Sequence, residues 1–287
     1  MTKGGETRRR GIFQRMLVLV VAAAGLGIIL YPAAGSWMSA AAISNDLKAY
    51  EQQVERSASS SNQQSLAAAR AYNANIPHGA LRDPYSSATS RQQATDDYQN
   101  YLRQLEMPGR YAMGTVRIPS IGVNLPIYHG TSDAALDRGA GHLYGSSLPV
   151  GGPSTHAVVT AHAGLPNATM FTDLQKVRKG DTFAVTVLDQ TLYYRVDQIT
   201  VTLPNDTTAL DIVPGEDYVT LLTCTPINVN SHRLLVRGER IAPPETASGM
   251  VVKTNPGFPW FIPIFVAGVA VIGALLYRRR DAAQRAA

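Results

Sequence analysis

Two long runs without charged residues lie near the two ends of the chain. The first begins at Met16 and stays uncharged as far as Ile43, with its most apolar part at Met16–Leu30. The second, Phe258–Tyr277, is twenty residues long and has aromatic residues near both of its ends. Twenty helical residues at about 1.5 Å each cross a hydrocarbon core of about 30 Å. The two runs therefore predict helices that span a membrane.

The first run also has the charged start and short apolar core of a cleavable signal peptide. Small residues at 33–35 and 39–42 offer a cleavage site, whereas the uncharged stretch that continues past Leu30 favours a retained anchor. Lys and Arg residues flank both runs on the sides that face the chain ends. The positive-inside rule then predicts two cytoplasmic termini, with residues 39–257 outside the cell.

Between the two runs, the apolar residues first follow a helical period. In residues 43–75 they recur at spacings of three and four, which predicts a helix with one apolar face. These residues are Ile43, Leu47, Tyr50 and Val54. A polar stretch at Ser57–Gln64 weakens the helix, and a second helical pattern covers Ser90–Leu105. Two prolines and a glycine within Asn75–Ala88 predict an irregular loop between them.

From Tyr111 onward the chain changes to short runs rich in Val, Ile, Thr and Tyr, separated by turn residues. We expect strands at Gly114–Ile118, Val123–Tyr128, His156–Ala161, Thr182–Leu188, Leu192–Leu203, Tyr218–Thr223 and Leu234–Ile241. Many short strands at close spacing predict an all-β barrel or sandwich rather than alternating strands and helices. Ser132 is a suitable N-cap for a one-turn helix over Asp133–Arg138.

The composition fits a folded protein whose charge is concentrated at its ends. Of the 287 residues, 45% are hydrophobic and 16% charged, which argues against wholesale disorder. Residues 1–15 contain five Lys and Arg against one Glu, and residues 278–287 contain four Arg against one Asp. With a total of +5, the remaining residues carry a net charge of −2. The body is therefore not basic, and nucleic-acid binding has no support.

The only cysteine, Cys224, follows an alternating stretch and precedes Pro226, so its thiol is expected at a strand end beside a loop. An isolated cysteine is most often a small buried hydrophobic residue. Arg233, however, lies across the following loop at the start of the next strand. Antiparallel pairing would bring this arginine to the end of the sheet that holds Cys224. A guanidinium there can lower the thiol pKa or bind an oxyanion.

A cysteine nucleophile also needs a proton-transfer partner, most often histidine. Among six histidines, His162 is the best placed, because it ends an apolar strand where a loop begins. His156 shares its strand parity but lies at the opposite end. The others lie in turns, in the irregular loop or on the other side of a strand: His78, His129, His142 and His232. A zinc site of His156, His162 and Cys224 stays an alternative, although no two of them have a familiar zinc-ligand spacing.

The segment Thr220–Cys224 resembles the Thr-Leu-x-Thr-Cys signature of sortases, the cell-surface transpeptidases of Gram-positive bacteria. Further matching motifs follow in the family's order across almost the whole segment between the two apolar runs. They are residues 125–131, 141–143, 147–152, 160–166 and 232–238. The resemblance implies an eight-stranded sortase β-barrel with Cys224 as nucleophile, His162 as acid and base, and Arg233 as stabiliser of the transition state. It implies no cofactor and no metal.

Two features resemble the pilin-polymerising class C branch rather than housekeeping sortases. One is the second apolar run, and the other is Asp83-Pro84-Tyr85, which is similar to the Asp-Pro-aromatic lid that class C enzymes lay over the active site. In a closed lid we expect Tyr85 to cover Cys224 and Asp83 to pair with Arg233. The chain departs from the branch at position 163, where an alanine stands in place of a common arginine, which puts a substrate contact of that arginine in doubt.

The resemblance implies cleavage of a Leu-Pro-x-Thr-Gly-like sorting signal through a thioacyl intermediate, followed by an isopeptide bond between pilins through lysine. The implied partners are pilin subunits and the membrane. A housekeeping sortase that anchors proteins to peptidoglycan and a non-catalytic membrane-anchored scaffold are the alternatives. The expected organisation is a basic tail (1–15), an anchor or signal peptide (16–38), a helical region (39–110) with the lid loop (76–89), the catalytic barrel (111–245), a linker (246–257), a transmembrane helix (258–277) and a basic tail (278–287).

Overall fold

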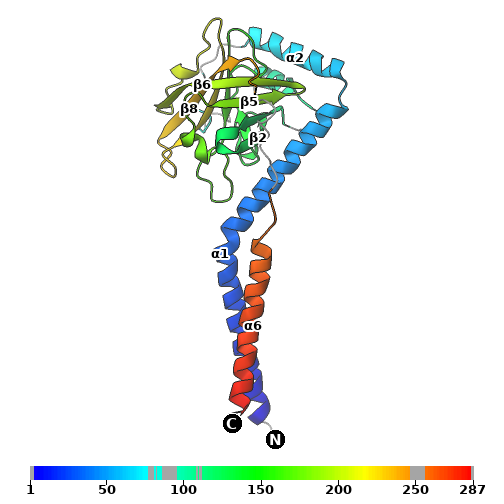
Figure 1. Ribbon diagram of the computed structural model, residues 1–287, viewed down its shortest axis with the longest axis vertical. Coiled ribbons are helices and arrows are strands. Elements are labelled where there is room, and N and C mark those ends of the chain that lie inside the picture. The colour runs from blue at the N-terminus through cyan, green and yellow to red at the C-terminus, as the bar shows by residue number, and fades with distance from the viewer. Residues whose placement is uncertain are drawn as a thin grey trace. The chain divides into compact units, whose positions relative to one another are not determined.

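The computed structural model describes residues 3–76, 81, 83–85, 96–107, 109, 112–245 and 256–285 (Figure 1). The chain divides into two compact units. One combines Met1–Met38 with Pro256–Ala287, and the other is Ser39–Asn255. Helix α1 (Lys3–Arg56) runs through the first unit and into the second without a break.

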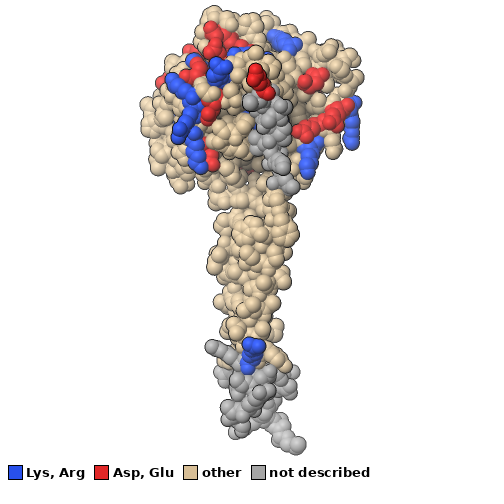
Figure 2. Space-filling model, viewed as in Figure 1, with Lys and Arg blue, Asp and Glu red and all other residues tan. Residues whose placement is uncertain are grey.

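The first unit consists of helices, and both are long and apolar enough to cross a membrane. They are the first part of α1 and helix α6 (Phe261–Arg285). The two helices pack closely, since a Cβ added to Gly268 would lie 2.6 Å from Leu26 Cδ2. At one end, Trp37 Nε1 donates a hydrogen bond of 3.0 Å to the Gly257 carbonyl. Figure 2 shows charged side chains spread over the second unit, whereas most of the described helix surface of the first is uncharged.

The second unit is built around a closed eight-stranded barrel, which confirms the predicted fold class. In the order around the barrel, the strands are β1 (Gly114–Ile118), β2 (Val123–His129), β3 (Ala140–His142), β4 (Thr155–Thr160), β7 (Asp217–Thr225), β8 (His232–Ile241), β6 (Gln190–Thr202) and β5 (Thr182–Val187). The pairs β2–β3 and β4–β7 are parallel, and the other neighbours are antiparallel. Short helices connect the strands: η1 (Pro119–Ile121), α5 (Asp133–Leu136), η2 (Thr172–Lys176) and η3 (Thr208–Leu210).

All seven predicted strands are present, and no strand end differs from the prediction by more than two residues. Strand β3 was not predicted, because its three residues Ala-Gly-His carry no run of β-branched side chains. Helix α5 is present as expected, but Ser132 makes no side-chain capping hydrogen bond, so the expected cap is wrong in detail. Backbone bonds from Ala135 and Leu136 to the Ser132 carbonyl start the helix instead.

The N-terminal helical region also differs from the expectation. Helix α1 continues as far as Arg56, and α2 (Ser59–Ala74) starts after only two residues. The polar stretch at 57–64 therefore interrupts the helical structure only at residues 57 and 58. Helix α4 (Asp96–Arg103) confirms the end of the second helical pattern. Positions 77–80, 82 and 86–95, and with them most of the expected lid loop and His78, lie outside the described residues.

Buried polar contacts attach these helices to the barrel. The Leu188 amide donates to the Tyr50 hydroxyl of α1 at 2.7 Å. Asn73 of α2 both donates to the Leu148 carbonyl and accepts from the Leu148 amide. The fully buried Tyr101 of α4 lies 2.9 Å from His142 Nδ1 and accepts from the Gly130 amide. The end of α1 around Tyr50, α2 and α4 are therefore fixed parts of the second unit, because each contact satisfies a buried polar group.

Candidate active site

Strands β4, β7 and β8 alternate between two buried faces. One face contributes to the barrel core, for example through Leu221 and Val236. The opposite face forms a second apolar cluster, which we call the outer-face cluster: Leu143, Val158, Leu210, Leu222 and Leu235. A strand places residues two apart on the same face, so Cys224 and Arg233 share the outer face with this cluster. The candidate site is the end of that face.

Strand pairing brings the two candidate residues of β7 and β8 together. Cys224 and Arg233 are directly opposite each other in the antiparallel register, as the sequence predicted. His162 lies two residues beyond Thr160, just as Cys224 lies two beyond Leu222, and Thr160 pairs with Leu222 in the parallel β4–β7 ladder. The three side chains therefore come from the same end of three adjacent strands, with β7 in the middle.

Asp83 closes on this site through its carboxylate. Its two oxygens accept hydrogen bonds of 2.6 Å from Nε and 2.8 Å from Nη2 of Arg233. Both side chains are about nine-tenths buried, since 9% of the Arg233 side chain and 11% of the Asp83 side chain are exposed. A bidentate ion pair of this kind fixes the plane of the guanidinium as well as neutralising its charge.

Tyr85 completes the cover. Its hydroxyl lies 2.8 Å from Thr160 Oγ1 and 2.7 Å from the Ala161 carbonyl. Its ring centre is 5.6 Å from that of His162, and the Arg233 guanidinium carbon is 5.2 Å from the ring centre. Between the two residues, Pro84 is buried. Asp83 and Tyr85 therefore contact Arg233, Tyr85 also contacts the ring of His162, and Cys224 is only 8% exposed.

Burial favours the uncharged forms of both candidate reacting groups. It raises the pKa of the Cys224 thiol; Arg233 lowers this pKa and Asp83 raises it further. Burial also lowers the pKa of His162. A neutral thiol beside a neutral imidazole is the less nucleophilic arrangement, because the thiolate is the attacking species. Burial at this site therefore disfavours the thiolate.

The loop after β7 orients Arg233 independently of Asp83. Arg233 Nη1 donates hydrogen bonds of 2.9 Å to the Asn230 carbonyl and 3.0 Å to the His232 carbonyl. Asn230 has a left-handed backbone with φ of 57°, which asparagine tolerates better than most residues. The Nε and Nη2 edge of the guanidinium is thus directed toward Asp83 by two separate sets of contacts. Sequence reasoning missed Asn230, whose only signal was its place in the loop.

The other described histidines are engaged in structural contacts. The His156 nitrogens lie 2.9 Å from the Asp211 carbonyl and 2.7 Å from Thr220 Oγ1. His142 is fully buried, and burial lowers its pKa to about 4. His129 lies 2.6 Å from the Gln104 carbonyl, and His232 contacts the Ser231 hydroxyl at 2.9 Å. Within the described parts of the chain, no group of three or more potential metal ligands is found.

Sequence reasoning also did not identify the outer-face cluster beside the candidate site. Leu81 and Tyr85 pack against it from the segment that carries Asp83. Leu210, from the connection between β6 and β7, also belongs to it. The alternation in β4, β7 and β8 could have shown that both strand faces are apolar, but only the fold shows which loops cover the second face.

Comparison with known proteins agrees with this geometry. The family described as the sortase domain matches residues 116–241, which include Cys224, His162 and Arg233. The crystal structure of sortase C-1 from Actinomyces oris has 50% sequence identity and a TM-score of 0.60, and the match covers 63% of this chain and 99% of that one. This chain belongs to the sortase family.

Other sortases show the extent of the likeness. The pilus-related sortase C of group B Streptococcus is 43% identical with a TM-score of 0.61, and the match covers 69% of this chain and 96% of that chain. Sortase A of Streptococcus agalactiae is 28% identical over 130 residues, which cover 44% of this chain and 52% of the relative. The chain spans about half the length of the curated relatives it matches. Sortases are cysteine transpeptidases. The single cysteine of this sortase, Cys224, lies at the end of β7.

Proposed function

We propose that this sortase is a class C enzyme that polymerises pilins. The observation that carries the proposal is that Asp83 pairs with Arg233 and Tyr85 lies against His162, because an Asp-Pro-aromatic lid is what the class C resemblance implies. The similarity to sortase C structures, one of them described as pilus-related, supports the same assignment.

In the first half of the proposed reaction, the Cys224 thiolate attacks the threonine carbonyl of a Leu-Pro-x-Thr-Gly-like sorting signal. Arg233 stabilises the tetrahedral oxyanion, a contribution that preorganised donors make in many acyl transfers. The bond between threonine and glycine then breaks, and the His162 imidazolium gives its proton to the departing glycine amine. The product is a thioester between Cys224 and the donor pilin.

In the second half, the amine of a lysine on the next pilin attacks the thioester. Neutral His162 takes the proton from the attacking amine, the carbon–sulfur bond breaks, and Cys224 leaves as a thiolate. An isopeptide bond joins the two pilins, and the starting protonation state returns. Acyl transfer of this kind balances without a cofactor.

The Asp83–Tyr85 segment acts in this proposal as a lid. In the closed state Asp83 occupies the edge of Arg233 that would face the oxyanion, and Tyr85 lies beside His162. The substrate can react only when this segment leaves. The lid thus protects a reactive thiol outside the cell, where no second cysteine of the same chain is present to pair with it.

The proposal also includes the orientation in the membrane. The two apolar helices hold the enzyme in the same layer as membrane-held pilin precursors, with both termini in the cytoplasm and the barrel outside. The supporting observations are the two helices that are long and apolar enough to span, and the Lys and Arg residues beyond their outer ends.

Intact-mass measurement of the purified full-length protein in detergent tests the reaction. With a sorting-signal peptide, we expect a mass increase equal to the peptide up to threonine, less one water. Addition of a pilin with an accessible lysine should discharge the adduct to that pilin, whereas discharge to a peptidoglycan-type amine alone would indicate a housekeeping sortase. Cys224→Ala should lose the adduct and at least about 10³-fold of the turnover. An adduct on Cys224→Ala would refute the proposal.

A further inference from the structure

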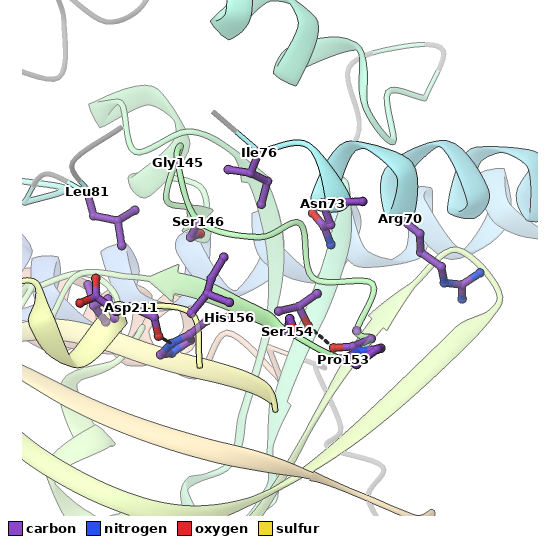
Figure 3. A pocket seen from close by; sticks show the side chains of 16 residues that line it. Arg70, Asn73, Ile76, Leu81, Gly145, Ser146, Pro153, Ser154, His156 and Asp211 are labelled. Atoms are coloured by element: carbon purple, nitrogen blue, oxygen red, sulfur yellow. Dashed lines mark hydrogen bonds between the residues drawn. The ribbon is translucent and has the colours of Figure 1, made fainter. Parts of the chain in front are cut away.

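A cavity of about 850 Å³ lies on the barrel surface beyond the outer-face cluster. Its walls come from α2, from the start of β4 and from the connection between β6 and β7. Figure 3 shows Arg70 and Asn73 on the helix at one side of this space, and His156 and Asp211 at another. None of the three residues proposed for catalysis lines it.

The chemistry of the wall suits an uncharged polypeptide. Several of its side chains are apolar: Ala74, Ile76, Leu81, Leu210 and Ile212. The two His156 nitrogens already have partners within the protein. Arg70 donates to Gln190 Oε1 at 2.7 Å, so this cation is also engaged. A mostly apolar hollow with a few polar groups binds ligand surface rather than a metal or a phosphate.

The cavity adjoins the outer-face cluster, at whose end the candidate active site lies. Leu81 and Leu210 line the cavity and also pack in or against the outer-face cluster. Leu210 further lines a narrow cleft together with Arg233 and Leu222, beneath Asp83 and Pro84. Leu210 therefore lies between the cleft beside Arg233 and the cavity, and Asp83 and Pro84 line that cleft.

The distance along β7 from Cys224 to the level of the cavity matches a short extended peptide. Thr220 lies four residues before Cys224 on β7, which corresponds to about 13 Å at about 3.3 Å per residue. Thr220 contacts His156, which lines the cavity, through the His156 Nε2. The four residues of an extended Leu-Pro-x-Thr segment cover about the same distance. If the threonine is bonded to Cys224, the residues that precede the leucine reach the cavity.

The direction follows from the proposed catalytic roles, so this step rests on the proposed function. The departing amine must face His162, which lies on the β4 side of Cys224. The acyl part of the substrate then extends away from His162, toward Arg233 and the β6–β7 connection. We propose that the cavity binds the residues of the donor protein immediately N-terminal to its sorting motif.

The test compares three peptides on the full-length enzyme in detergent. The first is Leu-Pro-Ala-Thr-Gly alone, the second adds five uncharged residues with two leucines at the N-terminus, and the third adds the same five at the C-terminus. We expect the N-terminal extension to raise kcat/KM for cleavage about tenfold, since burial of apolar side chains favours binding. The C-terminal extension should give no such gain.

A cavity-filling variant locates the effect. Ala74→Trp, at the exposed end of α2, should abolish the advantage of the extended peptide and leave cleavage of the short peptide unchanged. Ala71→Trp is the matched control, because Ala71 is exposed on the same helix and does not line the cavity. Ile212→Trp provides a second filling variant if Ala74→Trp fails to fold.

Two results would overturn the inference while leaving the proposed function intact. One is equal kcat/KM for the short and N-terminally extended peptides, and the other is an advantage that survives both filling variants. A gain from the C-terminal extension would reverse the proposed direction. Absence of a thioacyl adduct with all three peptides would instead refute the proposed function, and this site with it.

Discussion

At the scale of single residues, the closed site couples the protonation of two groups to the position of a third. With Asp83 on Arg233, burial and the added carboxylate raise the pKa of Cys224, and burial lowers that of His162. Moving the segment away exposes both groups and leaves the thiol beside an arginine without the opposing aspartate. Both changes favour the thiolate and the imidazolium, so in the proposed mechanism opening and activation are the same event.

His162 and His232 provide a comparison between a candidate acid and base and a nearby histidine. His162→Ala should reduce turnover of a sorting-signal peptide by roughly 10²–10⁴-fold, the usual range for lost acid–base catalysis. His232→Ala should retain turnover. Among the described hydrogen bonds, the His232 ring makes one, between Nδ1 and the hydroxyl of the neighbouring Ser231. Steady-state kinetics with thermal melting of each variant is the measurement.

The thermal melts matter because a destabilised barrel would also lose turnover. If His232→Ala proved as damaging as His162→Ala with an unchanged melting temperature, the assignment of the acid and base would be wrong. His156→Ala should act through stability, because it removes the partner of a buried Thr220 hydroxyl.

At the scale of elements, the Asp83–Tyr85 segment makes more buried contacts than an exposed turn would make. Its ion pair is largely buried, and a buried pair of charges is costly to break by removing one partner, at about 3–5 kcal/mol. Opening into solvent lessens this cost, because water then solvates both charges. Burial of one aromatic side chain adds about 1.5–3 kcal/mol to the closed state. In the proposed mechanism, substrate binding compensates for the lost contacts.

Removal of both lid contacts should speed alkylation of Cys224. For Asp83→Ala with Tyr85→Ala we expect at least about a tenfold rise in the second-order rate near pH 7, which corresponds to about 1.4 kcal/mol. The pH profile should also move to lower pH, because loss of burial and of Asp83 each lower the thiol pKa. Rates measured from pH 6 to 10 separate this shift from a change in access, which persists at high pH.

Asp197→Asn is the matched control, because it removes the carboxylate that pairs with Arg237 of the same strand β8. This pair does not contribute to the pKa shift of Cys224, so the control should retain the wild-type profile. Equal alkylation rates in the wild type and the double variant would show that the Asp83–Tyr85 segment is an ordinary turn.

The sequence predicted those parts of the site that depend on local pattern. Alternation identified β7 and β8, and their short connection returned Arg233 to Cys224. The pattern did not reveal the contact between Arg233 and the Asn230 carbonyl, because a backbone acceptor leaves no mark in side-chain chemistry. It also could not show that Leu81 and Leu210 cover the outer face, since both lie in connections whose path only tertiary packing decides.

At the scale of the whole molecule, charge and hydropathy distinguish the surfaces of the two units. The barrel unit carries mixed charges on its surface, whereas both helices of the other unit have long uncharged stretches (Figure 2). Helix α1 belongs to both units, so the transition between them falls within a continuous helix near Met38.

The single cysteine makes the proposed membrane orientation directly measurable. In intact cells, a membrane-impermeant maleimide should label Cys224 in the Asp83→Ala, Tyr85→Ala background, where the thiol is uncovered. A cysteine introduced by Ala287→Cys into Cys224→Ala should be labelled only after the membrane is permeabilised, since the arginines beside it favour the cytoplasmic side. Each variant has one thiol, so each signal reports one position. Labelling of Ala287→Cys in intact cells would place the C-terminus outside and contradict the orientation. Labelling of Cys224 only in permeabilised cells would place the barrel in the cytoplasm and contradict it as well.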